Sequence, residues 1–284
     1  MRIAILAKPK SEQAAATAAE LAESLRARGH ETRLEATAAL MAGVPGGVPR
    51  DELPEGADFA IVLGGDGTLL LGARTFGPAK VPILGINMGR LGFLTDTGVE
   101  GMDAVIERML SGEHEVEERL MLSCSVERPD GTREGPFLAF NDIVVNKGAL
   151  AQVIRLENWV DGDFVSDYLA DGLIIASPTG STAYGLAVGG PIIVPTTQVI
   201  LLAPICPHML TNRPIIVPAT STVECRLLEA RGDVYLTIDG QEGFPLFPAD
   251  RVRVSRSEHR ARLVKVASQD FFSILRTKMG WGRA

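Results

Sequence analysis

The sequence predicts a protein of two parts, an α/β N-terminal domain built on a parallel sheet and an all-β, sandwich-like C-terminal domain. In the first third of the chain, buried-strand patterns alternate with helical patterns. From about Val116, short segments of alternating polarity follow one another with few helical patterns between them. With 46% hydrophobic residues among 284, the chain can bury a substantial core. We place the domains at 1–115 and 116–266, and we expect residues 267–284 to form a C-terminal helix that packs back on the first domain.

The first domain begins with Ile3–Ala7, a continuous apolar run that is typical of a strand covered on both faces. A helix follows, in which Ser11 can cap the N-terminus and Gly29 can end the last turn. Phe59–Leu63 and Val81–Ile86 are two further buried strands. Alternation of this kind predicts a parallel sheet covered by helices.

In the second domain, pairs of turn-forming residues separate the predicted strands. Asp130-Gly131, Asp161-Gly162 and Gly232-Asp233 are such pairs, and residues 155–160 and 164–166 flank the second of them as a hairpin. Many short strands with few helices predict an antiparallel sandwich. The predicted strands are Leu120–Val126, Phe137–Val145, Val153–Val160, Val223–Leu228, Val234–Ile238, Val252–Ser255 and Leu263–Val266.

Composition excludes several classes of protein. The net charge of −7 argues against general nucleic-acid binding, because no basic field would gather phosphates. No apolar stretch is long enough to predict a membrane span or a signal peptide. Cys124, Cys206 and Cys225 lack metal-like spacing and fit small buried residues in a reducing cytosol, so we expect a cytoplasmic protein. The 30 glycines, about 11% of the chain, exceed the usual ~7% and point to tight turns or close approach to a ligand.

The first glycine-rich segment, Gly64-Gly65-Asp66-Gly67-Thr68, directly follows the strand Phe59–Leu63 and opens a helix. Glycines there let backbone N–H groups approach an anion at the helix N-terminus. Neither common nucleotide fingerprint is present: Gly-x-x-x-x-Gly-Lys-Ser/Thr is absent, and Leu70 stands where the dinucleotide motif needs a small residue. An Asp among such amides fits a metal ligand or a base beside a reacting hydroxyl, although Asp66 could also simply cap the helix.

Another segment, Asp171 to Gly190, combines glycines with hydroxyl groups. A strand leads into Ser177-Pro178-Thr179-Gly180-Ser181-Thr182-Ala183-Tyr184. Hydroxyls and backbone amides suit ribose and phosphate oxygens, and Tyr184 could stack on a flat base. The alternative is a Ser/Thr-rich turn with a tyrosine in the core, and the residues alone leave both open.

Together these segments resemble the NAD kinases. Gly64–Thr68 is similar to the signature that NAD kinases share with diacylglycerol and sphingosine kinases and, more loosely, with phosphofructokinases. Asp171–Tyr184 closely matches the most diagnostic NAD kinase motif. The resemblance extends over nearly the whole chain, implies a Rossmann-like N-terminal sheet, and includes Asn87–Thr95, Phe140–Val145, Ala203–Pro214, Asp239-Gly240-Gln241 and Phe272–Gly282.

The resemblance implies phosphorylation of the 2′-hydroxyl of the adenosine ribose of NAD to give NADP. The donor would be ATP or polyphosphate, and the cofactor a divalent cation, Mg or Mn. Asp66 is then the catalytic residue, which orients the hydroxyl, accepts its proton and is a candidate metal ligand. The donor phosphates would lie against Gly64, Gly65, Gly67 and Thr68. The residues implied to bind NAD are Asp66, Gly67, Asn141, Asp142, Gln152, Leu169, Asp171, Thr182, Ala183, Tyr184, Gly185, Leu186, Ala187 and Gln241.

The chain departs from the family pattern at Asp142, where the Asn-Glu motif has the longer Glu, and at Gln152 and Leu169, which are less secure matches. Members of the family are typically homo-oligomers in which a neighbouring subunit completes the site, so a homodimer or homotetramer is implied. Neither nucleic acid nor a membrane is expected as a partner.

Two alternative functions remain open at this point. One is a related kinase acting on a lipid hydroxyl, which would need an exposed apolar or basic face to meet a membrane. The other is a catalytically idle NAD sensor, against which Asp66 and its intact phosphate loop argue.

Overall fold

The computed structural model describes residues 1–89, 92–95, 97–149, 152–266 and 270–281, and it divides into two compact units. Unit 1 comprises Met1–Arg119 and His259–Ala284, and unit 2 comprises Leu120–Glu258. The long strands β6 (Glu115–Glu127) and β17 (Arg251–Lys265) contribute residues to both units. These units are sets of residues in mutual contact, so the domain limits 1–115, 116–266 and 267–284 stay a prediction.

Unit 1 contains a parallel sheet with the strand order β2-β1-β3-β4, as the alternating pattern predicts. Strand β5 and the end of β17 both pair with β4, also in parallel. The elements of this unit are β1 (Arg2–Ala7), α1 (Glu12–Ala27), β2 (Glu31–Leu34), α2 (Ala36–Met41), β3 (Phe59–Gly64), α3 (Asp66–Phe76), β4 (Ile83–Asn87), β5 (Thr97–Gly98), α4 (Met102–Leu110) and α6 (Phe271–Met279).

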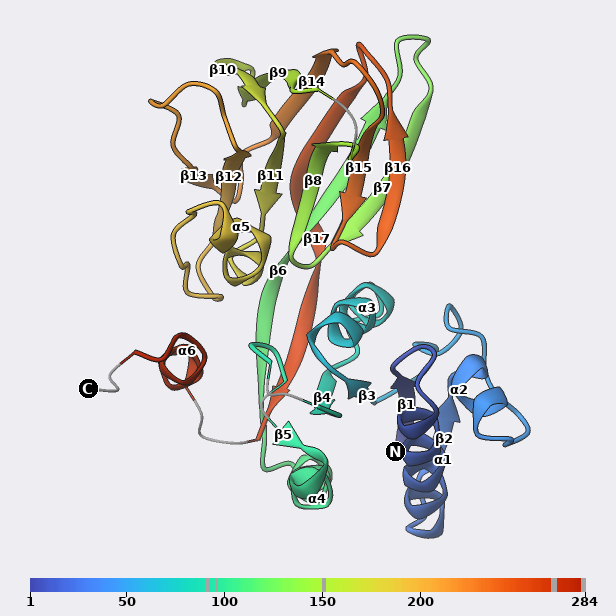
Figure 1. Ribbon diagram of the computed structural model, residues 1–284. Coiled ribbons are helices and arrows are strands. Elements are labelled where there is room, and N and C mark those ends of the chain that lie inside the picture. Colours follow the sequence, from blue (N-terminus) through green and yellow to red (C-terminus); the bar gives the residue numbers. More distant parts are fainter. Residues whose placement is uncertain (90–91, 96, 150–151, 267–269, 282–284) are drawn as a thin grey trace. The chain divides into compact units, whose positions relative to one another are not determined.

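Helices cover both faces of the parallel sheet, which is why its strands are continuous apolar runs. Ile3 and Ile61 belong to one core cluster with residues of α1 and α4. On the opposite face, Gly72 of α3 lies against Val62. Figure 1 shows α3 on one side of these strands, with α1 and α4 on the other. Helix α1 begins as predicted, since the Ser11 hydroxyl accepts a hydrogen bond from the Ala14 N–H at 3.3 Å.

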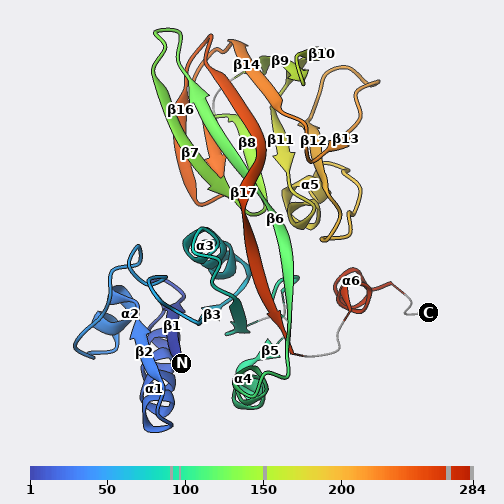
Figure 2. The ribbon, with the colours of Figure 1, turned by 180° about the vertical axis from the view of Figure 1, so that it is seen from behind.

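Unit 2 is an antiparallel β-sandwich, which confirms the predicted class of the C-terminal region. One layer has the strand order β13-β12-β11-β8-β15-β16; the other contains β10-β9-β14-β17 together with the β6–β7 pair. Figure 1 shows the first layer in front, and Figure 2 shows the second. The remaining bounds are β7 (Arg133–Ala139), β8 (Asp142–Lys147), β9 (Ile154–Val160), β10 (Asp163–Ala170), β11 (Gly172–Ala176), α5 (Tyr184–Ala187), β12 (Val199–Ile205), β13 (Ile215–Pro218), β14 (Val223–Glu229), β15 (Val234–Ile238) and β16 (Glu242–Leu246).

Alternate side chains of both layers fill the core between them. Leu173 and Ile175 of β11 face this core, together with Val223 and Cys225 of β14. Strand β11 is buried on its second face as well, where Ile174 packs in a separate cluster that also contains residues of β12. Because β11 is buried on both faces, the turn that follows it begins from a well-packed strand.

Two predicted strand assignments were wrong. The predicted strand Phe137–Val145 is two strands, β7 and β8, because backbone N–H groups of the residues between them bond to a side chain instead of a neighbouring strand. Val252–Ser255 and Leu263–Val266 are parts of a single strand, β17. The polar residues between them hide the continuity, since the inward positions there include the small residues Ser257 and Ala261.

The predicted hairpin at Asp161-Gly162 is confirmed. Val160 of β9 pairs with Asp163 of β10, and the two residues between them have positive φ angles of 54° and 89°, as a type I′ turn requires. Within the described residues, helices of the length and apolarity needed to cross a membrane do not occur.

Candidate nucleotide and phosphate site

In unit 1, the Gly64–Thr68 segment joins β3 to α3. Strand β3 ends at Gly64, Gly65 caps the helix without a side-chain bond, and Asp66 is the first helical residue. Gly64 and Thr68 are buried and lie against each other, whereas Gly65 is half-buried and Gly67 is exposed. Among the residues predicted to meet the donor phosphates, Gly65 and Gly67 therefore lie nearer the surface, and Gly64 and Thr68 support the turn.

The Asp66 carboxylate is held by the segment that follows β4. Its Oδ2 accepts the N–H of Phe93 at 2.8 Å, while its Oδ1 accepts the N–H of Leu94 at 3.1 Å and the hydroxyl of Thr95 at 3.3 Å. Each carboxylate oxygen can accept about two hydrogen bonds. Oδ2 thus keeps an unused acceptor direction among these bonds, and the carboxylate is fixed in orientation by three donors.

Residues 92–95 lie very close to Asp66. A Cβ at Gly92 would lie 1.8 Å from Asp66 Oδ1, so only glycine fits there. Thr95 is itself oriented, because its hydroxyl accepts a hydrogen bond from Asn87 Nδ2 at 2.8 Å. The predicted site lacks Asn87 and Thr95, although their position after a buried strand in a glycine-rich stretch was a usable signal. Arg90 and Leu91 of this segment lie outside the described residues.

In unit 2, the corner between β7 and β8 carries Asn141 and Asp142. The carboxylate of Asp239, just after β15, accepts the N–H groups of Phe140 at 3.1 Å, Asn141 at 2.7 Å and Asp142 at 3.2 Å. The Asp239 N–H in turn donates to the Asp142 carbonyl at 2.9 Å. Asp239 was missed as a site residue, although its Asp-Gly dipeptide after an apolar strand had been noticed.

The turn after β11 holds the carbonyl side of this corner. The Ser177 hydroxyl donates to the Phe140 carbonyl at 2.5 Å, and the Ser177 N–H donates to the Asn141 carbonyl at 2.8 Å. A Cβ at Gly180 would lie 2.2 Å from the same Asn141 carbonyl oxygen, so glycine is needed for this approach. The backbone of Asn141 is thus bonded, whereas its buried side-chain Oδ1 has no hydrogen-bond partner among the described residues.

Asp142 is an unusual carboxylate. It is only 5% exposed, and burial together with the neighbouring Asp239 raises the pKa of Asp142 to about 7. A buried carboxyl of this kind changes its protonation near neutral pH. Perturbed groups of this type are common in functional sites.

Tyr184 opens α5, directly after the one-turn 3₁₀ helix Thr179–Thr182. It is 41% exposed, which excludes the alternative of a tyrosine in the core. Burial of part of the ring and the nearby groups Cys206, Asp171 and Asp142 raise the pKa of Tyr184, so these predicted residues share one region of unit 2. Asp171 also pairs with Lys147 at 3.5 Å.

Other predicted residues are placed less clearly. Gln241 follows the Asp239 turn, where its N–H donates to Ile238. The N–H of Gln152 donates to Arg231, and the carbonyl of Leu169 accepts from His208. These backbone bonds do not join Gln152 or Leu169 to the Asn141 corner.

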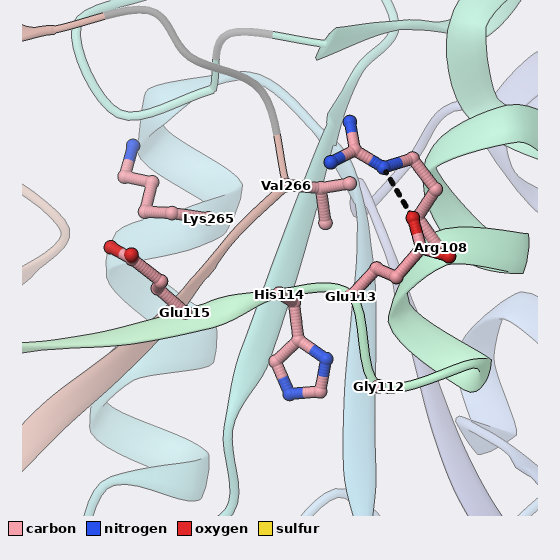
Figure 3. Close-up of a pocket in the computed structure, with 7 residues that line it drawn as sticks. All are labelled: Arg108, Gly112, Glu113, His114, Glu115, Lys265 and Val266. Carbon is pink, nitrogen blue, oxygen red and sulfur yellow. Dashed lines mark ion pairs between the residues drawn. The ribbon is translucent and has the colours of Figure 1, made fainter.

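A pocket of about 690 Å³ lies elsewhere in unit 1 (Figure 3). Arg108 pairs with Glu113 at 3.5 Å across it, and the His114 ring meets Phe59 edge-on at 5.3 Å. The residues predicted to bind nucleotide do not line it. It lies where α4 is followed by β6, and its lining contains both acidic and basic side chains.

Comparison with known proteins agrees with this arrangement. Residues 47–114 match the model of the ATP-NAD kinase N-terminal domain, and residues 140–266 match that of the ATP-NAD kinase C-terminal domain. The chain is 46% identical over 281 residues to the NAD kinase of Geotalea daltonii and 47% identical to that of Geobacter sulfurreducens, with 99% of each chain covered.

Two solved structures are also similar. An NAD kinase from Archaeoglobus fulgidus in complex with ATP has a TM-score of 0.77 and 28% identity, with 99% of both chains covered. Yeast NADH kinase complexed with NADH shares the fold, with a TM-score of 0.89 at 24% identity over 100% of this chain and 88% of that one. On this evidence the chain belongs to the NAD kinase family.

Proposed function

We propose that this protein transfers the γ-phosphoryl group of ATP to the 2′-hydroxyl of the adenosine ribose of NAD and so produces NADP. The observation that carries the proposal is the Asp66 carboxylate, half-buried at the end of β3, fixed by three donors and still able to accept through Oδ2. Membership of the NAD kinase family supports the identity of the substrate.

The chemistry asked of Asp66 is modest. Phosphoryl transfer passes through a loose transition state, in which alignment and charge neutralisation matter more than a strong base. Asp66 would accept a hydrogen bond from the 2′-hydroxyl, orient its oxygen toward the donor and take its proton. The N–H groups of Gly65 and Gly67, at the start of α3, suit the charge of the donor phosphates.

The nucleoside end of NAD would be held by unit 2. Asn141 offers a buried, unpartnered Oδ1, and Asp142 offers a carboxylate that can accept from ribose hydroxyls. Tyr184 is exposed enough to stack on a base. Asp171, Thr182, Ala183, Gly185, Leu186, Ala187 and Gln241 complete the proposed site, and Gln152 and Leu169 are its least supported members.

We also propose a divalent cation, Mg or Mn, as cofactor. Among the described residues, no cluster of three His, Cys, Asp or Glu side chains could hold a metal alone. Mg²⁺ is commonly bound by one or two carboxylates together with substrate phosphates, and Asp66 Oδ2 fits that role. Such an ion would neutralise charge on the transferring phosphoryl group.

The test is to replace Asp66 with Asn and measure both NADP formation and NAD binding. We expect turnover to fall by about 10²–10⁴-fold, because a positioned acid–base group contributes about that much, while NAD still binds. Asp103→Asn is the matched control, since Asp103 is exposed in the first turn of α4 and should keep full activity. Near-wild-type turnover of the Asp66 variant would refute the assignment, and wild-type protein that binds NAD without ever forming NADP would indicate a sensor.

We infer a cytoplasmic homodimer or homotetramer, with ATP as donor and polyphosphate as a second candidate. The Archaeoglobus fulgidus relative was solved with ATP, which supports ATP. Light scattering of the purified protein and an NADP assay with each donor would decide these points.

A further inference from the structure

We infer that Asp239 is a positioning residue for nucleotide binding, because its carboxylate fixes the backbone of the Asn141–Asp142 corner. The inference rests on the proposed function for the identity of the nucleotide. Asp239 itself would not contact the nucleotide. It would act through Asn141 and Asp142, which are proposed to bind it.

The geometry at the end of β15 supports the positioning role. One carboxylate accepts three successive N–H groups, those of residues 140, 141 and 142, over 2.7 to 3.2 Å. Without that acceptor these N–H groups would have no ladder partner, because β7 has ended at Ala139 and β8 begins at Asp142. Asp239 itself adopts a φ of 51° and is 8% exposed, so the surroundings impose its conformation.

Other residues hold the carbonyl side of the corner. Ser177 occupies its carbonyl oxygens, and Gly180 closes on it from the same side. Asp239 holds the N–H side of the corner, and so positions the backbone from which the Asn141 and Asp142 side chains project. The nearest analogue in the chain is Asp161, which also precedes a glycine, has a φ of 54° and accepts the Thr222 N–H at 2.8 Å, but lies exposed in the β9–β10 turn.

Two buried carboxylates side by side also interact through their charges. Asp239 contributes to keeping Asp142 protonated at a pH where an isolated carboxyl would be ionised. Tyr184 of α5 interacts electrostatically with Asp142, and also with Cys206 after β12 and with Asp171, which pairs with Lys147. A protonated Asp142 accepts fewer ribose hydroxyl donors than an ionised one, so nucleotide binding should strengthen as the pH rises through about 7.

The experiment compares Asp239→Asn and Asp239→Ala with Asp161→Asn and Asp161→Ala as matched controls. For Asp239→Ala we expect the KM for NAD to rise about tenfold or more with a smaller change in kcat, because three N–H groups lose their acceptor. For Asp239→Asn we expect the pH midpoint of NAD binding to move down by about one unit, because a like charge has been removed. The Asp161 variants should change neither quantity.

A readout independent of activity separates this inference from the proposed function. In protein labelled with ¹³C at aspartate carboxyls, the resonance that disappears in Asp142→Asn reports the ionisation of Asp142. Its midpoint should fall in Asp239→Asn and stay in place in Asp161→Asn, whether or not NADP is formed. An unchanged midpoint, or an equal rise in KM in the Asp161→Ala protein, would overturn the inference.

Discussion

The contact between Gly92 and Asp66 gives the sharpest prediction about catalysis. Replacing Gly92 with Ala would place a Cβ 1.8 Å from Asp66 Oδ1, whereas real Cβ contacts essentially never fall under 3.0 Å. The carboxylate or the segment 92–95 must therefore move by more than about 1 Å, and such a displacement of a reacting group can cost ~10²-fold in rate. That loss corresponds to about 2.7 kcal/mol of transition-state stabilisation.

The structure indicates which steps should suffer. The hydrogen bonds from Phe93, Leu94 and Thr95 to Asp66 cannot all survive the shift. Hydrogen bonds to a charged acceptor contribute about 1.5–3 kcal/mol each, so even partial loss accounts for the expected effect. The Asn141 corner and Asp142 belong to unit 2 and keep their hydrogen bonds, so the KM for NAD should change less than kcat.

The assay is steady-state NADP formation with saturating ATP, combined with thermal unfolding to confirm that each variant is folded. Gly98→Ala is the matched control, because a Cβ at Gly98 meets nothing within 4 Å and its φ is negative. A Gly92→Ala protein with near-wild-type kcat would refute the idea that the segment orients Asp66. The same conclusion would follow if Gly98→Ala lost as much activity.

Three further predictions concern unit 2. Because the folded-state pKa of Asp142 is raised to about 7, this group should stabilise the fold most below pH 4 and lose that contribution as the pH rises to 7, and urea titrations at several pH values should show this slope flattened in Asp142→Asn. Gly180→Ala would put a Cβ 2.2 Å from the Asn141 carbonyl oxygen, so NAD affinity measured by calorimetry should fall at least about tenfold. Asp250 is 1% exposed and pairs with Arg128, so Asp250→Ala should lower the free energy of unfolding by about 3 kcal/mol, and a change below ~1 kcal/mol would contradict the pairing.

Much of the fold could be predicted because local signals and tertiary packing agree. Strands β1 and β3 are continuous apolar runs covered on both faces, and α1 has a capping Ser11 and a closing Gly29. Strand β12 is not among the predicted strands, because its burial on both faces removes the alternation by which strands are recognised.

The site was harder to predict in full because some of its side chains bind backbone N–H groups that are far away in the sequence. Asp66 and Asn141 stand out in the sequence, but Asp239 is about a hundred residues from the N–H groups it accepts. Thr95, which follows β4, acts on Asp66, which follows β3, over a shorter separation of 29 residues. Such pairings depend on which strand ends meet, and a single sequence does not specify that.

Asp66 and Asp239 belong to the same dipeptide, Asp-Gly, but have different roles. Both precede a glycine, both follow a β-strand within two residues, and both carboxylates accept hydrogen bonds from three donors. Asp66 is half-buried, and its Oδ2 accepts from a single N–H, so a substrate hydroxyl or a cation can still reach it. Asp239 is buried at 8% exposure, and its carboxylate accepts three successive backbone N–H groups, so it is suited to ordering its neighbours. Exposure, which the motif itself does not encode, therefore separates the group suited to chemistry from the group suited to positioning.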